Sequence, residues 1–316
     1  MFAEVASATL VGVDGRPVAV EVQVTNGMPA FSIVGLPDAS CREARDRVRA
    51  ACASSGVTWP RTRITVNLAP SGFSKVGSGL DLAIAVALLA ADGQLPAAAV
   101  AGLAFLGELG LDGSVRRVEG TVALAAAARR RAGALVVGRD GAAEAALVAG
   151  LAVHPAVSLR HVVATLRGDD RWSPNPPLPL AEPDDGPGDL ADVRGQPLGR
   201  LAVEVAAAGG HHLLLVGPPG AGKTMLANRL PGLLPPLEPD EAVEVTRIHS
   251  AAGLRLPSSV LVRRPPFRAP HHTASPVSLI GGGGATMRPG EISCAHRGVL
   301  FLDELGEFPA DVLDTL

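Results

Sequence analysis

The sequence predicts a protein of two domains with mixed α/β and α+β structure, and three observations support this prediction. Its 316 residues correspond to roughly two domains of ordinary size. Of these residues, 47% are hydrophobic and 19% are charged, at a net charge of -3, a balance that is typical of globular proteins and excludes a disordered chain. Strand-like and helix-like periodicities alternate over the first half, and a run rich in Pro and acidic residues then divides the chain.

Strand and helix signals follow one another along the first half. Residues 4–13 and 17–24 alternate in polarity around Asp14 and Gly15, a turn dipeptide, and therefore predict a β-hairpin. Residues 40–54 place apolar side chains on one helical face and arginines elsewhere, which predicts an amphipathic helix. Later signals predict strands at 63–68, 101–109 and 134–137 and helices at 80–91 and 119–132. Such alternation is typical of an α/β or α+β domain.

The segment 172–188 is too rich in Pro and acidic residues for a helix or a central strand. We expect it to be a linker between one domain at 1–171 and a second domain at 189–316. The alternative, an ordered surface loop within one domain, stays open, although structureless loops of this length are uncommon in compact domains.

Charge and cysteine content exclude several classes of protein. A pI near 6.2 excludes a uniformly basic surface that holds nucleic acid by charge alone, but not a local basic patch. Cys41, Cys52 and Cys294 show no CxxC spacing, so neither a disulfide framework nor a zinc site is predicted. The N-terminus lacks signal-peptide features, and the longest apolar stretch, 82–91, is too short to cross a bilayer. We therefore expect a cytoplasmic protein without a membrane partner.

After the expected linker, an apolar strand predicted at 211–216 leads into a glycine-rich loop and then a helix at 225–230. The loop fills the pattern G-x-x-x-x-G-K-[ST] in the strand, loop and helix context that this motif requires. Its glycines let the backbone wrap around a polyphosphate, Lys223 reaches the terminal phosphates, and Thr224 ligates magnesium. We therefore predict a site for ATP and Mg²⁺ formed by Gly217, Pro218, Pro219, Gly220, Ala221, Gly222, Lys223 and Thr224.

A second motif is the hydrophobic strand predicted at 299–304, which ends in two carboxylates, Asp303 and Glu304. Paired acids suit the carboxyl end of such a strand when a cation or a reaction lies there. Asp303 is expected to hold magnesium through water, and Glu304 to polarise the water that attacks the γ-phosphate. Glu304 and Lys223 are thus the predicted catalytic residues. An exposed helix N-cap also produces two acidic residues in a row, so the Asp303 and Glu304 pair indicates a magnesium site only together with the glycine-rich loop upstream.

Four segments together resemble the YifB/ComM family of magnesium-chelatase-like AAA+ ATPases: DLADVRGQ, GPPGAGKT, RRPPFRAPHHTAS and RPGEISCAHRGVLFLDELGEFP. The opening MFAEVASATLVGVDGRPVAVEVQVTNGMPAFSIVGLPDAS and the later APSGFSKVGSGLDLAIAVALLA resemble that family's first domain, which is similar in fold to the Lon protease domain. The resemblance implies a Lon-protease-like domain at 1–171 and an incomplete P-loop AAA+ domain at 189–316. It also implies an ATP-driven motor that forms homo-hexamers, with ComM-type members acting as DNA helicases in branch migration during natural transformation.

Lon proteases use a Ser and a Lys, so this resemblance raises the possibility of peptidase activity. In this sequence, Gly79 stands at the position of that Ser, with Ser78 one place away, and Val122 stands near the position of the Lys. The chain has no Lys between Lys75 and Lys223. Because a serine without a base stays protonated, we expect a scaffold that is not a protease.

The most basic segment of the chain is a candidate contact for DNA or for a neighbouring subunit, with a solvated Pro-rich loop as the alternative. It contains Arg263, Arg264, Arg268, His271 and His272. Together with Cys294 and His296, its histidines match no known metal-site spacing. Since the chain has no Tyr and only 3% aromatic residues, we expect DNA to be held through its backbone rather than by base stacking.

The strands of AAA+ folds run in the order 5-1-4-3-2, in which the strand ending at Val216 is strand 1 and the strand before Asp303 is strand 3. Strand 4, the sensor residue, the arginine finger and the helical lid are expected after Leu316. The chain is thus expected to be the N-terminal part of a longer protein and to hydrolyse little ATP by itself. Two alternatives stay open: a magnesium-chelatase-like remodelling ATPase that does not act on DNA, and a catalytically silent binding module.

Overall fold

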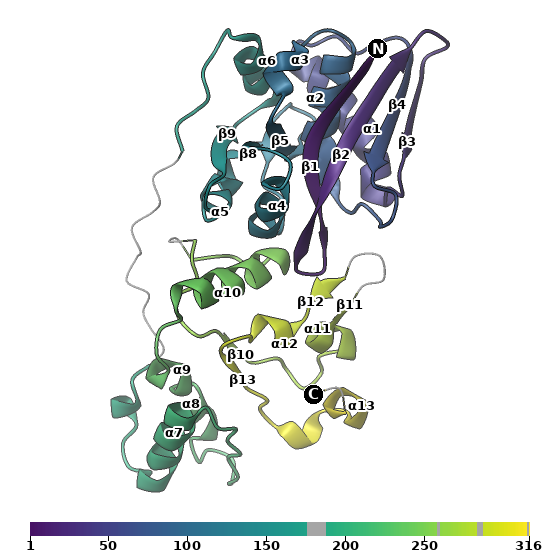
Figure 1. Cartoon of the computed structure of the whole chain (residues 1–316). Helices are drawn as coiled ribbons and strands as arrows, with labels where there is room; N and C mark the ends of the chain where they lie inside the picture. The colour runs from purple at the N-terminus through teal and green to yellow at the C-terminus, as the bar shows by residue number, and fades with distance from the viewer. Residues whose placement is uncertain (176–187, 258–259, 283–286, 315) are drawn as a thin grey trace. The chain divides into compact units, whose positions relative to one another are not determined.

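The computed structural model describes residues 1–175, 188–257, 260–282, 287–314 and 316. These residues divide into two compact units, one on each side of the segment 176–187 (Figure 1). Most of the expected linker at 172–188 therefore lies outside the described residues. Trp172, at its start, packs with the first unit, because its indole stacks on the His154 ring with centroids 4.9 Å apart.

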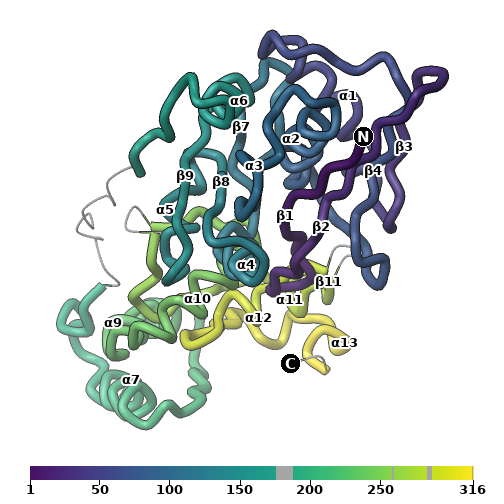
Figure 2. The backbone as a smooth tube through the Cα atoms, turned by 45° about the horizontal axis from the view of Figure 1, so that its top comes forward, coloured from purple at the N-terminus to yellow at the C-terminus, as the bar shows by residue number. Residues whose placement is uncertain are grey.

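The first unit contains a seven-stranded sheet made of β1 (Phe2–Val11), β2 (Asp14–Thr25), β3 (Ala30–Val34), β4 (Arg63–Ala69), β5 (Leu103–Leu106), β8 (Ala134–Gly138) and β9 (Ala152–Ala156). The strand order is β3-β4-β2-β1-β5-β8-β9, with β3 and β9 at opposite edges (Figures 1 and 2). β2 pairs antiparallel with β1 and β4, while the other four pairings are parallel. The predicted mixed α/β class is confirmed for this unit.

Helices cover both faces of this sheet: α1 (Ala39–Ser54), α2 (Asp81–Ala91), α3 (Ala97–Val100), α4 (Thr121–Ala128), α5 (Ala142–Ala145) and α6 (Leu159–Arg167). Buried side chains of α1, α2, α3 and α6 form one hydrophobic cluster, and those of α4 and α5 form another. Strand β5 supplies both by alternation, since Phe105 belongs to the first cluster and Ala104 and Leu106 to the second. The sheet therefore has a core on each face.

The first hairpin forms as predicted, but its turn lies elsewhere. Gly12 and Val13 make the turn, with Gly12 at a φ of +62°, whereas Asp14 and Gly15 are already paired in β2. Gly15 serves packing instead, because a Cβ at this position would collide with the carbonyl oxygen of Ala123 in α4. Glycine here lets the helix approach the strand closely.

Three titratable side chains are enclosed in or beside this core. Lys75, in the loop between β4 and the short helix η1 (Ser78–Leu80), has 0% of its surface exposed. Its ammonium donates to the carbonyl oxygens of Pro70 and Phe73, and burial lowers its pKa. The free thiols of Cys41 and Cys52 lie on the buried face of α1, where burial raises the pKa of Cys52 to about 12.

A separate two-stranded ladder in the first unit joins β6 (Glu108–Leu109) to β7 (Val115–Arg116). No helix in the described part of either unit is both long enough and apolar enough to cross a membrane.

The second unit contains short helices and minimal strands. Its helices are α7 (Pro197–Gly209), α8 (Lys223–Ala227), α9 (Leu230–Leu233), α10 (Pro239–Ala251), α11 (Pro276–Ile280), α12 (Glu291–Cys294) and α13 (Ala310–Leu313). β10 (Phe267–Arg268) pairs parallel with β13 (Val299–Leu300), and β11 (Gly281–Gly282) pairs antiparallel with β12 (Arg288–Pro289). The hydrophobic clusters of this unit are small, so most of its loops are open to solvent.

The strand predicted at 211–216 does not form. No strand among the described residues pairs with this segment, and its Leu214 and Val216 side chains are 73% and 87% exposed. A strand satisfies its amides through a neighbour, so an apolar sequence without one remains irregular. The strand predicted at 299–304 is likewise reduced to β13, whose pairing in the described residues is with β10.

Candidate functional site

The glycine-rich loop runs into helix α8 and is open to solvent over residues 217–220. Gly220 and Gly222 have φ angles of +77° and +82°, and Gly222 caps the start of α8 in the left-handed conformation. No atom lies within 4 Å of the Cβ position of Gly220, so the positive φ itself is what favours glycine there. The free amides at the start of α8 thus border an exposed loop, an arrangement that attracts anions.

Lys223 turns its ammonium back onto this loop. Its Nζ donates to the carbonyl oxygens of Gly217 at 2.9 Å and Pro218 at 3.0 Å. The side-chain amide of Gln196 donates to the carbonyl oxygen of Ala221 from outside the loop. Sequence reasoning missed this contact, although Gln196 ends the DLADVRGQ motif that it singled out.

The two predicted magnesium ligands meet although 79 residues separate them: Thr224 Oγ1 donates to Asp303 Oδ2 at 2.8 Å. The second oxygen, Asp303 Oδ1, accepts from the amide of Glu304 at 3.1 Å. A hydroxyl and a carboxylate are the hard oxygen ligands that Mg²⁺ prefers, and here they converge beside the glycine-rich loop. The residues present therefore fit a magnesium ion, which Thr224 and Asp303 would hold.

Glu304 occupies a special backbone position next to this pair. Its φ is +53°, which is uncommon for a residue other than glycine, and its side chain is exposed. Its Oε2 lies 3.4 Å from Nδ1 of His272. Sequence reasoning grouped His272 with the basic segment and missed this contact. The available signal was the order of elements, since His272 follows β10 and Glu304 follows β13, and neighbouring parallel strands end at the same edge.

The arginines of the basic segment differ in exposure. Arg268 donates from Nε and Nη2 to the two carboxylate oxygens of Glu291 at 2.5 and 2.7 Å, and this pair raises the pKa of the guanidinium. A guanidinium held in this way meets a phosphate only by breaking the pair, so Arg268 is the arginine of this segment that is held most firmly within the protein, and its contact with DNA stays a prediction. Arg263 and Arg264 are exposed.

The histidines and the cysteine near this segment make structural contacts. His249 Nε2 lies 2.8 Å from the carbonyl oxygen of Cys294, and His296 Nε2 lies 3.2 Å from Glu244 Oε2. The rings of His271 and His272 lie close together, with centroids 4.0 Å apart. Across the described residues, no three His, Cys, Asp or Glu side chains gather in a group that holds a metal.

In the first unit, the residues at the positions predicted to match the Ser and Lys of Lon proteases have no lysine ammonium directed at them. Ser78 donates to the carboxylate of Glu108, and the Lys75 ammonium is turned toward its own loop. A Cβ at Gly79 would lie 2.8 Å from Val118 Cγ1, so a serine at that position requires the valine to move. Val122 is 2% exposed within α4, where a lysine would be buried without a partner.

Comparisons with known proteins cover both units. Residues 189–316 match the family described as "Magnesium chelatase, subunit ChlI", and residues 20–140 match "Subunit ChlI of Mg-chelatase". An uncharacterized protein of Mycobacterium tuberculosis is 48% identical over 311 residues, which are 98% of this chain and 62% of that protein.

Two further relatives have names. The uncharacterized protein YifB of Escherichia coli is 45% identical over 312 residues, 96% of this chain and 60% of YifB. Competence protein ComM of Haemophilus influenzae is 43% identical over 325 residues, 100% of this chain and 62% of ComM. The chain thus spans about three fifths of the length of the curated relatives it matches.

Proposed function

The chain belongs to the YifB/ComM family of magnesium-chelatase-like proteins, and from this membership we propose that it is the nucleotide-binding part of an AAA+ ATPase that moves along DNA. The observation that carries the proposal is the hydrogen bond between Thr224 and Asp303. It joins the end of the glycine-rich loop to the acidic strand end, and the meeting of these two motifs supports a ligand that both contact.

The chain's own residues would divide the work as follows. Thr224 and Asp303 would hold Mg²⁺, directly or through water, and the bound ion would supply positive charge beside the terminal phosphates. Lys223 exchanges its two loop carbonyls for phosphate oxygens, which are better partners for an ammonium. Glu304 accepts the proton of the attacking water, and His272, 3.4 Å from its Oε2, positions that carboxylate.

The proposal extends to the whole protein through its relatives. ComM is named a competence protein, and competence is the capacity to take up DNA, which supports DNA as the substrate. Family resemblance also favours a homo-hexameric ring in which ATP turnover drives branch migration. Arg263 and Arg264 are the members of the basic segment whose exposure suits a contact with DNA.

We assign the first unit a Lon-protease-like scaffold role without peptidase activity. Three local observations support this role. Ser78 donates a hydrogen bond to the Glu108 carboxylate, Gly79 packs against Val118, and Val122 is buried. Appearance of peptidase activity that is lost in Ser78→Ala would contradict this role.

A second candidate is a remodelling ATPase that does not act on DNA. The observation in its favour is that both matched families are named for the magnesium chelatase subunit ChlI. ATP turnover by the protein at the relatives' full length separates the two candidates. Stimulation by DNA supports the motor, whereas turnover that is indifferent to DNA supports the remodelling ATPase.

Mg²⁺-dependent ATP binding by the 316-residue chain tests the site itself. Asp303→Ala is expected to remove the Mg²⁺ dependence of ATP affinity, because the ion loses its carboxylate anchor. Asp311→Ala, an exposed acid in α13, is the matched control and should leave it unchanged. At full length, Glu304→Gln should bind ATP normally and stop turnover. Equal Mg²⁺ dependence in the parent and Asp303→Ala would refute the site.

A further inference from the structure

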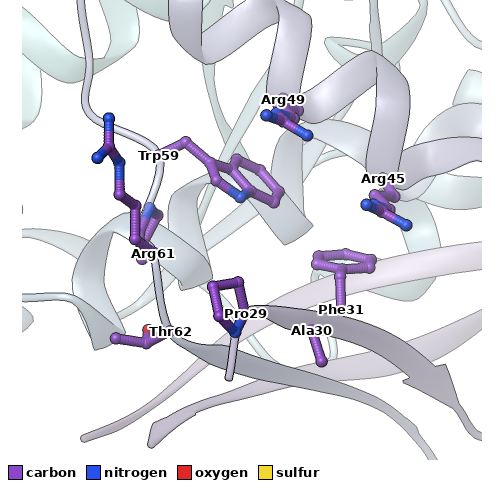
Figure 3. A pocket seen from close by; sticks show the side chains of 9 residues that line it. Pro29, Ala30, Phe31, Arg45, Arg49, Trp59, Arg61 and Thr62 are labelled. Carbon is purple, nitrogen blue, oxygen red and sulfur yellow. The ribbon is translucent and has the colours of Figure 1, made fainter. Parts of the chain in front are cut away.

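A pocket of about 260 Å³ opens at one edge of the seven-stranded sheet, in the first unit (Figure 3). Three elements line it: the edge strand β3 contributes Phe31, helix α1 contributes Arg45 and Arg49, and the segment that leads into β4 contributes Trp59 and Arg61. None of these residues belongs to the glycine-rich loop or to the acidic strand end, so the pocket is a separate site.

Two aromatic rings form the apolar part of the pocket. Phe31 and Trp59 have ring centroids 5.7 Å apart with their planes inclined at 35°, and both side chains are only half-buried. Aromatic residues make up 3% of the chain, so a pair that remains open to solvent is a notable concentration. Flat, partly exposed rings of this kind provide surfaces on which another planar ring stacks.

Three guanidinium groups surround the rings. Arg45 and Arg49 lie one helical turn apart on α1, Arg61 lies beside Trp59, and all three are exposed. In the part of the chain that the structure describes, none of them makes a hydrogen bond or an ion pair. Arg47 on the same helix behaves differently, since Asp81 holds it at 2.6 and 3.0 Å. The pocket thus concentrates positive charge that the protein leaves uncompensated.

One wall of the pocket also carries an unsatisfied hydroxyl. Thr62 Oγ1 is shielded from solvent and has no hydrogen-bond partner among the described residues. Buried polar atoms are nearly always paired, so an orphaned one beside an open pocket indicates a missing partner. Because the hydroxyl is shielded, it would meet a hydrogen-bonding ligand only after its side chain rotates toward the pocket.

We propose that this pocket binds single-stranded nucleic acid, with a base stacked on Trp59 or Phe31 and the neighbouring phosphates held by Arg45, Arg49 and Arg61. Free phosphate would leave the two rings unused, and a neutral peptide would leave the three guanidinium groups unpaired. A double helix hides the faces of its bases in the stack, so only an unpaired strand offers both groups together. The volume admits one base rather than a large cofactor.

This site goes beyond the proposed ATPase, because it lies in the other unit and needs no nucleotide turnover. It also revises the expectation from composition that DNA is held through its backbone alone. Few aromatic residues are sufficient for base stacking when the fold gathers two of them beside free arginines.

Fluorescence anisotropy of a labelled oligodeoxynucleotide of about 15 nucleotides tests the proposal on the 316-residue chain without ATP. The parent should bind the single strand at least about tenfold more tightly than an abasic strand of equal length or the matching duplex. In a Trp172→Phe background, Trp59 is the remaining tryptophan, and its fluorescence should be quenched by the single strand. Equal affinity for the abasic strand would reduce the pocket to an anion site and overturn the proposal.

Arg49→Glu should weaken binding by about tenfold or more and flatten its salt dependence. The matched control is Arg130→Glu, which makes the same change in net charge at an exposed position after α4, over the other face of the sheet, and should change affinity less than about twofold. Trp59→Ala should also weaken binding about tenfold, with Trp59→Phe retaining most of it. Because Trp59 contacts the core, thermal unfolding of both variants accompanies the measurement.

Equal loss in Arg49→Glu and Arg130→Glu would show that binding depends on overall charge and would overturn the proposal. So would a parent chain that ignores the oligonucleotide but self-associates in sedimentation through a surface that Arg49→Glu disrupts, since that result makes the pocket a protein interface. Lys223→Ala should bind the single strand like the parent. A failure of the ATPase proposal is therefore distinguishable from a failure of this one.

Discussion

The chain has two lysines, one in each unit, and both point their ammonium groups at carbonyl oxygens of the loop that precedes them. Lys75 is 0% exposed, whereas Lys223 is only partly buried and its partners Gly217 and Pro218 are exposed. When a buried ammonium leaves its carbonyl partners, both the ammonium and the carbonyl oxygens remain without a hydrogen bond and without access to water. An exposed ammonium can exchange its carbonyls for a phosphate, so the same contact is structural in one unit and available to a ligand in the other.

The loop that contains Lys75 is also anchored more firmly than the loop that leads to Lys223. In the first unit, Thr9 and Asp38 accept hydrogen bonds from the amides of Val76 and Gly77 at 3.0 and 2.9 Å. In the second unit, the side chain of Gln196 contacts the loop at an exposed position. The surroundings of each lysine loop, more than its chemistry, therefore decide whether the ammonium is fixed within the fold or open to exchange its partners.

Lys75→Met should produce the largest effect on this comparison, a loss of about 3 kcal/mol in the free energy of unfolding of the first unit. The reason is that two buried carbonyl groups lose their donor while the apolar stem stays in place. Urea unfolding followed by tryptophan fluorescence measures this loss, because Trp59 and Trp172 both pack with the first unit. Lys223→Met is the control, with a change below about 0.5 kcal/mol. Equal losses in the two variants would break the comparison.

Lys223→Ala should weaken ATP binding about 100-fold, or roughly 2.7 kcal/mol, without loss of stability. The variant removes the positive charge that faces the terminal phosphates. Titration calorimetry with ATP and Mg²⁺ gives the affinity, and Arg194→Ala, at an exposed position of the same unit, controls for the loss of one charge. A Lys223→Ala protein with parental affinity would show that this loop does not bind phosphate.

The anchors of the two loops should differ by a smaller amount. Asp38→Ala is expected to cost about 2 kcal/mol of stability, since this side chain caps α1 through the Cys41 amide at 2.7 Å and also holds Gly77. Gln196→Ala is expected to cost less than about 0.5 kcal/mol, because its contact is exposed. Hydrogen exchange of the loop amides reports both values. A larger loss of stability in Gln196→Ala than in Asp38→Ala would show that the second unit's loop is the more firmly anchored of the two.

Acid should affect both units, and this is the smallest of the effects. Burial lowers the pKa of His154 in the first unit and of His249 in the second, so folding favours the neutral form of each ring. The unfolded chain takes up these protons first, near its ordinary pKa of about 6.5, and stability therefore falls as the pH drops through and below that value. Thermal midpoints between neutral pH and about pH 5 check this, with His249→Gln and His154→Gln each reducing the slope.

The hydrophobic periodicity of the sequence predicted many elements of the first unit, because in that unit the periodic apolar side chains are the buried ones. Alternation in Phe105 and its neighbours, and the buried face of 40–54, match the two cores of the sheet. The edge strands β3 and β9 and the helix α6 were not predicted. Strands β3 and β9 are five residues each at the sheet edges, and their pairing depends on distant partners that no local pattern reveals.

Prediction failed where tertiary partners decide the outcome. The apolar run at 211–216 carries the same signal as a buried strand but finds no pairing partner in the described residues. In the site, the spacing of motifs identified Thr224 and Asp303, which the structure brings together. The roles of His272 and of the Phe31 and Trp59 pocket could not be read from sequence, because each depends on segments that meet only in the folded chain.

The three buried thiols provide a built-in probe of how fast each unit opens. Cys41, Cys52 and Cys294 are all buried, and burial raises the pKa of each thiol, so an alkylating reagent finds almost no thiolate in the native protein. Two of these thiols lie on α1 and the third on α12. Each unit therefore incorporates label only while it is open, two equivalents from the first and one from the second. Mass spectrometry of the labelled peptides measures the opening rates of the first and the second unit separately, in the same sample and without any substitution.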